Sequence, residues 1–356
     1  MMRRHGLSLN ACRSISIRRT NVERGLEFQT SRPDPLRRFT PTPYTTSLPI
    51  MDRTICLETN DVRILKHAAG LFSDYQPSPA GRPDFLWRIV SQPSPQRDPV
   101  WPQRSAFSDS GLRFAEFGQT NFVAVDLDGR EGVGYLAEGL VEGDLGLTSP
   151  FLDNMFCWTA GSLGLTSIFA ASVGIHGNAL LVAGAANSGK TTASYIAAKN
   201  GLEFHADRAV FLEMRQEGLL AWGDFSPAAF RPDVLKFLPE LQSSTRPLRF
   251  CDFTYHYLDK RVYQTAPARP AIPVCCVFLE RQTAGELTLS RLSRPELSKR
   301  LDGLAAFQDD ARFETQRAAV LKALEALPAY NLVFANDPVA AAECFPGLLR
   351  EHAARI

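Results

Sequence analysis

The clearest pattern of apolar and polar positions lies in the middle of the chain, over residues 179–201. Residues Ala179–Ala183 form a short, continuous apolar run, which predicts a buried strand. A glycine-bounded polar octapeptide follows at Gly184–Thr191, and the sequence after it reads as a helix that ends at Gly201. The order of strand, loop and helix predicts an α/β unit here.

Apolar periodicity elsewhere predicts a mixture of helices and strands. An amphipathic helix is expected at Asp61–Phe72, where apolar side chains recur at helical spacing. The other expected helices are Arg294–Phe307, Arg312–Leu327 and Pro338–His352, and a loop is expected at Glu138–Asp144. The expected strands are Phe85–Val90, Leu112–Phe117, Asn121–Leu127, Gly132–Leu136, Leu202–Glu213 (two strands around a turn at Asp207), Val274–Leu279 and Tyr330–Phe334.

The first 50 residues differ in composition from the rest of the chain. They contain nine arginines, no lysine and three acidic residues, and no apolar period persists in them. Such a segment buries too little apolar surface to fold alone. Three interpretations stay open: a disordered tail, a targeting segment, or an over-extended translation whose true start is Met51. We therefore expect deletion of residues 1–50 to leave folding unchanged.

An uncharged stretch of 21 residues, Met155–Ile175, is long enough to span a bilayer. Glycines and hydroxyl side chains interrupt it, however, and it leads directly into the strand predicted at Ala179–Ala183. We therefore expect a buried helix to about Phe169, then a buried strand at Ala171–Ile175, and no membrane segment.

Composition is that of a globular, cytoplasmic protein. The chain has 356 residues, 45% hydrophobic and 22% charged, and a net charge of +1, which gives no general support for nucleic-acid binding. Its seven cysteines follow no disulfide or zinc pattern, so reduced thiols are expected.

The octapeptide Gly184–Thr191 reads Gly-Ala-Ala-Asn-Ser-Gly-Lys-Thr and fits G-x-x-x-x-G-K-S/T, the P-loop that cradles phosphates. A chance match in a glycine-containing turn is the alternative, and the flanking strand and helix favour the P-loop. Its amides and the following helix N-terminus would bind anions, Lys190 would reach the β- and γ-phosphates, and the Thr191 hydroxyl would bind Mg²⁺. The expected nucleotide-binding residues are Gly184, Ala185, Ala186, Asn187, Ser188, Gly189, Lys190, Thr191 and Thr192.

Asp207 is the candidate acidic partner of this loop. It follows a predicted strand, 17 residues after Lys190. A phosphotransferase needs a carboxylate that holds Mg²⁺ or accepts the proton of the phosphoacceptor. We therefore expect Asp207 and Lys190 to be catalytic, and Thr191 and Asp207 to bind the metal.

The stretch Ala179–Leu212 resembles the HPr kinase/phosphorylase family and its relatives, which share a fold with phosphoenolpyruvate carboxykinase. The matching features are the loop Gly184–Thr191, Asn200-Gly201 at the helix end, and Ala206-Asp207. Weaker likeness extends the resemblance to about residues 155–350, through Phe230-Arg231-Pro232, Lys260–Tyr263, Ile272–Leu279 and Leu327–Leu332. The resemblance implies transfer of the γ-phosphate of ATP to a hydroxyl, often a serine, of a protein, peptide or small molecule.

The fold expected from this resemblance is mixed α/β (α+β), with a P-loop core of the phosphoenolpyruvate carboxykinase/HPr kinase type. The expected domains are the tail at 1–50, a small mixed α/β segment at 51–154 and a nucleotide-binding domain at 155–352. The expected ligands are ATP, Mg²⁺ and an unidentified phosphoacceptor. Relatives of this type are often oligomers, so a homo-oligomer is also an expectation.

Two positions depart from the family pattern. The second acid of the family's Ala-Asp-Asp element is Arg208 here, and the histidine that usually opens the strand before the family's P-loop aligns with Phe169. The alternative function is therefore a nucleotide-binding regulator with weak or no catalysis. A transport or mechanical ATPase is disfavoured, because no Leu-Ser-Gly-Gly-Gln signature occurs.

Five other polar residues are interpreted first as structural or solvent-exposed residues. They are His176, His205, Arg231 and the pair Lys260-Arg261. His205 is a weak candidate for the site, because strand alternation would place it on the same face as Asp207.

Overall fold

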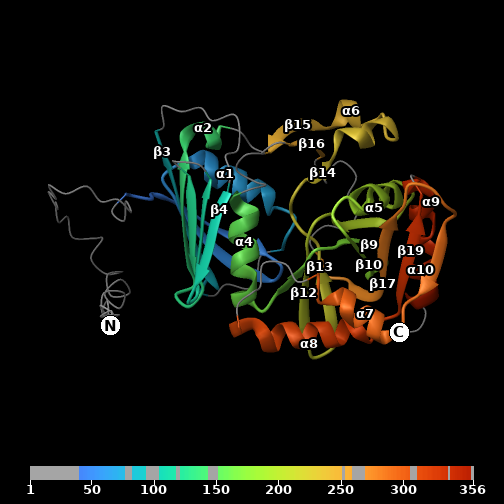
Figure 1. Cartoon of the computed structure of the whole chain (residues 1–356). Coiled ribbons are helices and arrows are strands. Elements are labelled where there is room, and N and C mark those ends of the chain that lie inside the picture. Colours follow the sequence, from blue (N-terminus) through green and yellow to red (C-terminus); the bar gives the residue numbers. More distant parts are fainter. Residues whose placement is uncertain are drawn as a thin grey trace, which may run out of the picture. The chain divides into compact units, whose positions relative to one another are not determined.

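The computed structural model describes residues 40–76, 82–93, 104–117, 121–142, 151–250, 253–258, 269–304, 311–335 and 337–353. Residues 41–356 form one compact unit. It has a mixed α+β architecture that contains several sheets (Figure 1).

A seven-stranded sheet forms the first part of this unit. Its strands are β1 (Tyr44–Ile50), β2 (Arg53–Thr59), β3 (Phe85–Gln92), β4 (Arg104–Asp109), β5 (Leu112–Phe117), β6 (Phe122–Asp126) and β7 (Glu131–Ala137), in the order β1-β2-β3-β7-β6-β5-β4. Ile55, Leu57 and Trp87 are fully buried against α1 (Val62–Leu71) and α4 (Asp153–Ala160). Asp61 begins α1, because its carboxylate accepts a hydrogen bond from the Arg63 amide.

The strand β1 lies inside the segment 1–50 that composition predicted to be unfolded. It pairs antiparallel with β2, and Leu48 and Ile50 are buried. Met51 and Asp52 form the tight turn between the two strands, with φ of 50° and 61°. Pairing with β2 supplies Tyr44–Ile50 with the burial that this segment lacks alone. The first 39 residues of that segment lie outside the described part of the chain.

A six-stranded sheet forms the second part, in the order β11-β9-β10-β17-β19-β18. Its strands are β9 (Ala171–Ile175), β10 (Asn178–Gly184), β11 (Glu203–Ala206), β17 (Ile272–Arg281), β18 (Thr288–Arg291) and β19 (Ala329–Phe334). Its helices are α5 (Lys190–Lys199), α7 (Arg294–Leu301), α8 (Glu314–Glu325), α9 (Pro338–Glu343) and α10 (Phe345–Ala353). The sheet is mixed, because β10 runs parallel to β17 but antiparallel to β9.

The centre of this sheet is buried on both faces. Leu180 and Val182 pack in one core with side chains of α5, α9 and α10, whereas Leu181 and Ala183 pack in another with side chains of α7 and α8. This double burial explains the continuous apolar run at Ala179–Ala183. The loop at Gly184 therefore leaves from the middle of a well-packed sheet.

Smaller elements complete the unit. One three-stranded sheet contains β8 (Thr166–Ile168), β12 (Val210–Arg215) and β13 (Gly218–Trp222), and another contains β14 (Ala228–Phe230), β15 (Arg246–Phe250) and β16 (Phe253–Leu258). Short helical turns are α2 (Glu138–Val141), η3 (Gly161–Leu163), η4 (Pro232–Lys236), α6 (Leu241–Ser244) and η6 (Ala311–Phe313).

The uncharged stretch Met155–Ile175 forms several elements. The helix expected to reach Phe169 stops at Ala160, and Gly164, whose φ is 79°, follows the last residue of η3. The strand β9 has the predicted bounds. The expected domain boundary at 154/155 falls within α4, which packs in the core of the seven-stranded sheet. Within the described residues, no helix has the length and apolarity needed to cross a membrane.

Candidate functional site

The candidate phosphate loop connects the central strand β10 to α5. Gly184 ends the strand with φ of 140°, and a Cβ there would lie 2.6 Å from the Leu279 carbonyl oxygen. Gly189 precedes α5 with φ of 94°. Both glycines therefore have backbone conformations that L side chains rarely adopt, and Gly184 also allows close approach to β17.

The loop and the start of α5 offer backbone amides to an anion. No side chain caps the N-terminus of α5, and no acidic residue lies in its first turn. Ala185, Ala186 and Asn187 are exposed, whereas Ser188 is buried and its hydroxyl has no hydrogen-bond partner. An uncapped helix N-terminus that is open to solvent can bind a phosphate group.

Lys190 extends over this loop. Its Nζ donates to the carbonyl oxygens of Gly184 and Ala185, at 2.9 Å each. Burial lowers the pKa of Lys190, and the negative charge of Asp207 opposes that shift. The ammonium group therefore lies beside the loop and interacts electrostatically with the Asp207 carboxylate.

Asp207 follows β11 and is 2% exposed. Its Oδ2 accepts a hydrogen bond from the Ala229 amide at 2.9 Å, whereas its buried Oδ1 has no hydrogen-bond partner. Thr191 is half-buried and Thr192 is buried, both in the first turn of α5. A buried carboxylate oxygen without a donor is suited to accept a proton or to bind a cation.

Arg208 follows Asp207 directly and forms an ion pair with Asp153, at the start of α4. Asp153 also accepts a hydrogen bond from the Ser226 hydroxyl, and Asp224 Oδ2 accepts one from the Arg208 amide at 3.3 Å. Burial works against the charged form of Arg208, but the Asp153 and Asp207 carboxylates outweigh it and raise the pKa of Arg208. This guanidinium is therefore a fixed positive charge.

Sequence reasoning did not find Asp153, Ser226 or Asp224. Asp153 is only 6% exposed and lies two residues before the uncharged run that begins at Met155. An acidic residue at the start of an apolar helix signals a buried charge, which requires a partner. The partner itself could not be identified, because Arg208 is 55 residues away.

The other candidates have structural surroundings. His176 lies with Gly177 in the turn between β9 and β10, with φ of 51°. His205 Nε2 is 3.4 Å from Glu203 Oε2, and a register shift between Phe204 and Ala206 interrupts the expected strand alternation. Arg231 is exposed and lies 3.8 Å from Asp233. Lys260-Arg261 lies outside the described residues.

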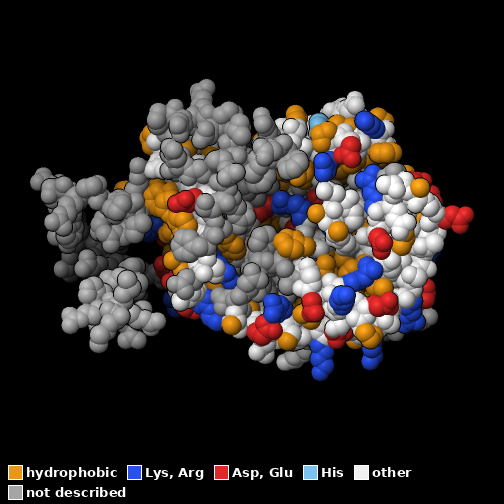
Figure 2. All heavy atoms as spheres, viewed as in Figure 1, with side chains coloured by type: hydrophobic (Ala, Val, Ile, Leu, Met, Phe, Trp, Pro, Cys, Tyr) orange, Lys and Arg blue, Asp and Glu red, His pale blue; other side chains and the backbone are white. Residues whose placement is uncertain are grey.

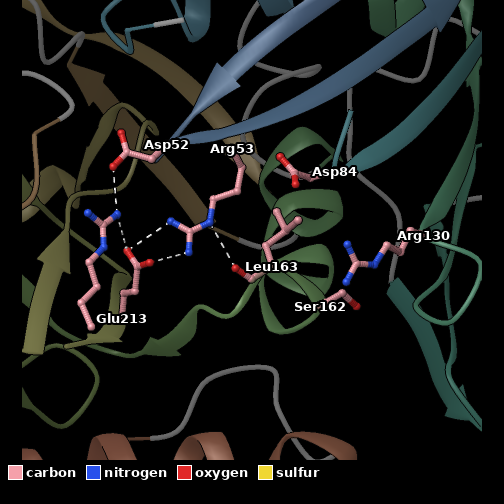
Figure 3. A pocket seen from close by; sticks show the side chains of 8 residues that line it. Asp52, Arg53, Asp84, Arg130, Ser162, Leu163 and Glu213 are labelled. Atoms are coloured by element: carbon pink, nitrogen blue, oxygen red, sulfur yellow. Dashed lines mark hydrogen bonds and ion pairs between the residues drawn. The ribbon is translucent and has the colours of Figure 1, made fainter. Parts of the chain in front are cut away.

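A separate polar hollow of about 480 Å³ opens near the β1–β2 turn (Figure 3). Its lining contains none of the loop residues, and consists of Asp52, Arg53, Asp84, Arg130, Ser162, Leu163, Glu213 and Arg215. Arg53 donates to Glu213 and to the Leu163 carbonyl oxygen, and Arg215 pairs with Asp52 and Glu213. Most of these charges therefore neutralise one another and join β2 to β12.

The surface charge of the described residues is mixed. On the face drawn in Figure 2, acidic and basic side chains are interspersed. Among the described residues, no group of three or more His, Cys, Asp or Glu side chains could hold a metal ion. Within the described part of the chain, the loop beside Lys190 and Asp207 is the strongest candidate site, because it combines an uncapped helix N-terminus, a lysine and a buried carboxylate oxygen without a donor.

Comparison with known proteins gives limited information. No protein-family model matches the chain, and no curated protein matches it. Among solved structures, the HPr(Ser) kinase/phosphatase from Coxiella burnetii is similar over 53% of this chain and 97% of that chain, with 11% sequence identity and a TM-score of 0.29. A superposition this loose supports no functional assignment.

Proposed function

We propose that this chain is an ATP- and Mg²⁺-dependent phosphotransferase of the HPr kinase type, which transfers the γ-phosphoryl group to a serine-type hydroxyl of a protein, peptide or small molecule. The observation that carries the proposal is the placement of Lys190 over an open, glycine-bounded loop, in the electrostatic field of the buried Asp207. The β10–loop–α5 connection supports a core of the phosphoenolpyruvate carboxykinase type.

The reaction divides the work among a few groups. The acceptor oxygen bonds to the γ-phosphorus as the bond to the β,γ-bridging oxygen breaks, and ADP leaves with that electron pair. Asp207 accepts the hydroxyl proton at Oδ1, while the Ala229 amide holds Oδ2 in place. Lys190 and the first amides of α5 bind the phosphates and offset their charge.

The residues at the site fit Mg²⁺. This ion usually takes one or two protein oxygens and completes its shell with water and phosphate oxygens, so a single buried carboxylate suffices. Thr191 and Asp207 would hold it, and Oδ1 of Asp207 is the buried oxygen without a donor. When bound, the ion would neutralise charge on the β- and γ-phosphates. Oδ1 cannot bind Mg²⁺ and accept the proton in the same step, so when Asp207 is the base, the Thr191 hydroxyl, water and the phosphate oxygens would hold the ion.

A nucleotide-binding regulator without transfer is the second candidate. Arg208 favours this candidate. It occupies the position where the HPr kinase/phosphorylase family has its second acid, and it pairs with Asp153. A site with one carboxylate instead of two can bind nucleotide and still lack turnover.

Transfer is tested by incubating the full chain with Mg²⁺ and γ-labelled ATP, together with extract from the source cells. We expect label on a discrete acceptor with the wild type and none with Asp207→Asn, which keeps an oxygen for the Ala229 amide. We expect Asp207→Asn to bind ATP with the affinity of the wild type, which would show that the variant has lost the transfer step and not nucleotide binding. Equal labelling by both proteins would contradict the role of Asp207, whereas binding without transfer by the wild type would favour the regulator.

A further inference from the structure

The polar hollow near the β1–β2 turn has one side on which the charges are already paired. Arg53 and Arg215 share the carboxylate of Glu213, and Arg215 also pairs with Asp52. Two cations and two anions meet here, so this side carries no net charge. Its charged groups bind one another and hold the wall of the hollow in place.

Two other charged side chains of the hollow stand outside this network. The exposed side chain of Arg130 forms no hydrogen bond or ion pair with any described residue, and it extends toward Ser162 (Figure 3). The Oδ2 atom of Asp84 accepts a hydrogen bond from the Thr54 amide at 2.9 Å, but its carboxylate pairs with no cation of the described chain. The hollow therefore offers one unpaired positive and one unpaired negative charge.

The backbone holds these two residues near each other. Asp84 directly precedes β3 and Arg130 directly precedes β7, and the two strands pair in parallel with Leu86 opposite Glu131. The Leu86 amide donates to the Arg130 carbonyl oxygen at 3.0 Å, and the Asp84 amide donates to that of Thr54 at 2.8 Å. Because neighbouring strands lie about 4.8 Å apart, both charges are carried at the same end of the sheet within a short distance.

A ligand with a single charge fits this arrangement poorly. Arg130 would attract an anion that Asp84 repels, and a cation would experience the reverse. A ligand that carries both charges gains from both residues, because its ammonium group donates to a carboxylate and its carboxylate accepts two parallel hydrogen bonds from a guanidinium. An α-amino acid has these two groups on one carbon, which matches two opposite charges carried by adjacent strands.

We propose that this hollow is a binding site for a free α-amino acid, with the ligand carboxylate on Arg130 and the ligand ammonium group on Asp84. The hollow measures about 480 Å³, which lies within the range of about 300–1,000 Å³ that is common for small-ligand sites. The Ser162 hydroxyl donates only a long hydrogen bond, 3.4 Å, to the Leu127 carbonyl oxygen, so its oxygen can accept a further one from the ligand. No residue of the phosphate loop lines the hollow, and the inference does not depend on the nucleotide site.

The competing explanation is that Arg130 is only solvated and that Asp84 serves only to join β3 to β2 through Thr54. Calorimetric titration of the full chain with each standard amino acid, and then with the deaminated acid and the decarboxylated amine of the one that binds best, separates the two. We expect saturable binding of at least one amino acid, and at least about tenfold weaker binding of both analogues. No saturable binding up to about 10 mM would overturn the proposal. Equal binding of the deaminated acid would also overturn it, because it would indicate a simple anion site.

Substitutions at the two unpaired charges provide the second test. Arg130→Gln and Asp84→Asn should each weaken amino-acid binding at least about tenfold, and Asp84→Asn keeps an oxygen for the Thr54 amide. Arg291→Gln, on the exposed strand β18, is the matched control and should bind like the wild type. Asp84→Asn should also bind the deaminated acid more tightly than the wild type does, because the repulsion is gone. A purely structural Asp84 would not produce this gain, and wild-type affinity in both variants would contradict the proposal.

Lys190→Ala separates this inference from the proposed function. Amino-acid binding should be unchanged in Lys190→Ala, and ATP binding should be unchanged in Arg130→Gln. Loss of amino-acid binding in Lys190→Ala would overturn the inference of a separate site. Amino-acid binding by a wild-type chain that fails to bind ATP would refute only the nucleotide site.

Discussion

Arg53 on β2 and Glu213 on β12 form a two-point ion pair, with Arg53 Nη2 2.7 Å from Glu213 Oε1 and Nη1 3.1 Å from Oε2. Arg215 and the indole N–H of Trp222 also contact Glu213 Oε2. The Glu213 carboxylate thus connects the seven-stranded sheet with the three-stranded sheet of β8, β12 and β13.

Glu213→Gln should destabilise the protein. The substitution removes the carboxylate shared by the largely buried Arg53 and the half-buried Arg215, which we expect to lower the free energy of unfolding by about 2–3 kcal/mol. Urea denaturation of the full chain measures this value. Glu217→Gln on the exposed β12–β13 turn is the matched control and should change stability by less than about 0.5 kcal/mol. Equal midpoints for the wild type and Glu213→Gln would contradict the account.

The same carboxylate should make stability depend on acid pH. Burial alone would raise the pKa of Glu213, but hydrogen bonds from Arg53, Arg215 and Trp222 outweigh it and lower the pKa from 4.5 to about 2. A lowered folded-state pKa contributes stability above the unfolded-state value, and this contribution disappears as the pH falls from about 4.5 to 2. The difference in melting temperature between wild type and Glu213→Gln should therefore shrink over that range. A constant difference would show that the carboxylate is not the titrating group.

The strand β1 should contribute to stability. A chain that starts at Met51 loses the partner of β2 and the buried side chains of Leu48 and Ile50, whereas a chain that starts at Pro41 keeps them. At about 1.5–3 kcal/mol for each buried aliphatic side chain, the shorter chain should lose about 3–6 kcal/mol. Chemical denaturation compares the two chains, and equal stability would restore the view that folded protein begins at residue 51.

Gly184→Ala should impair nucleotide binding through the loop backbone. The added Cβ would meet the Leu279 carbonyl oxygen at 2.6 Å, in a residue whose φ is 140°. Gly201→Ala is the matched control, because its φ of 103° is also positive but nothing lies within 4 Å of a Cβ. We expect both variants to lose about 1–3 kcal/mol of stability, and only Gly184→Ala to lose ATP affinity. Equal ATP affinity in both would contradict the assigned role of the loop.

Local signals in the sequence predicted much of the fold. The apolar run at Ala179–Ala183 predicted β10 because a strand buried on both faces needs no polar positions, and β5 has the predicted bounds Leu112–Phe117. The extent of α4 could not be predicted in this way. It ends at Ala160 because the chain continues as η3 and then turns at Gly164 into β8, which pairs with β12 more than 40 residues later.

The candidate site was predictable only in part. The loop Gly184–Thr191 is a contiguous motif, and Asp207 was found from its position after a strand. The residues around Asp207 come from elsewhere in the chain. The Ala229 amide donates to Asp207, and Asp153 pairs with the neighbouring Arg208. His205 was expected on the same strand face as Asp207. A register shift between Phe204 and Ala206 in β11 interrupts the strand alternation on which that expectation depended.

The most direct test of the central claim is calorimetric titration of Mg²⁺-ATP into the full wild-type chain, Lys190→Ala and Lys199→Ala. Lys199 lies at the other end of α5 and pairs with Glu240 at 2.5 Å, so it controls for loss of a lysine from the same helix. We expect saturable ATP binding by wild type and Lys199→Ala, and at least about 100-fold weaker binding by Lys190→Ala. No binding by the wild type, or equal affinity in Lys190→Ala, would contradict the central claim.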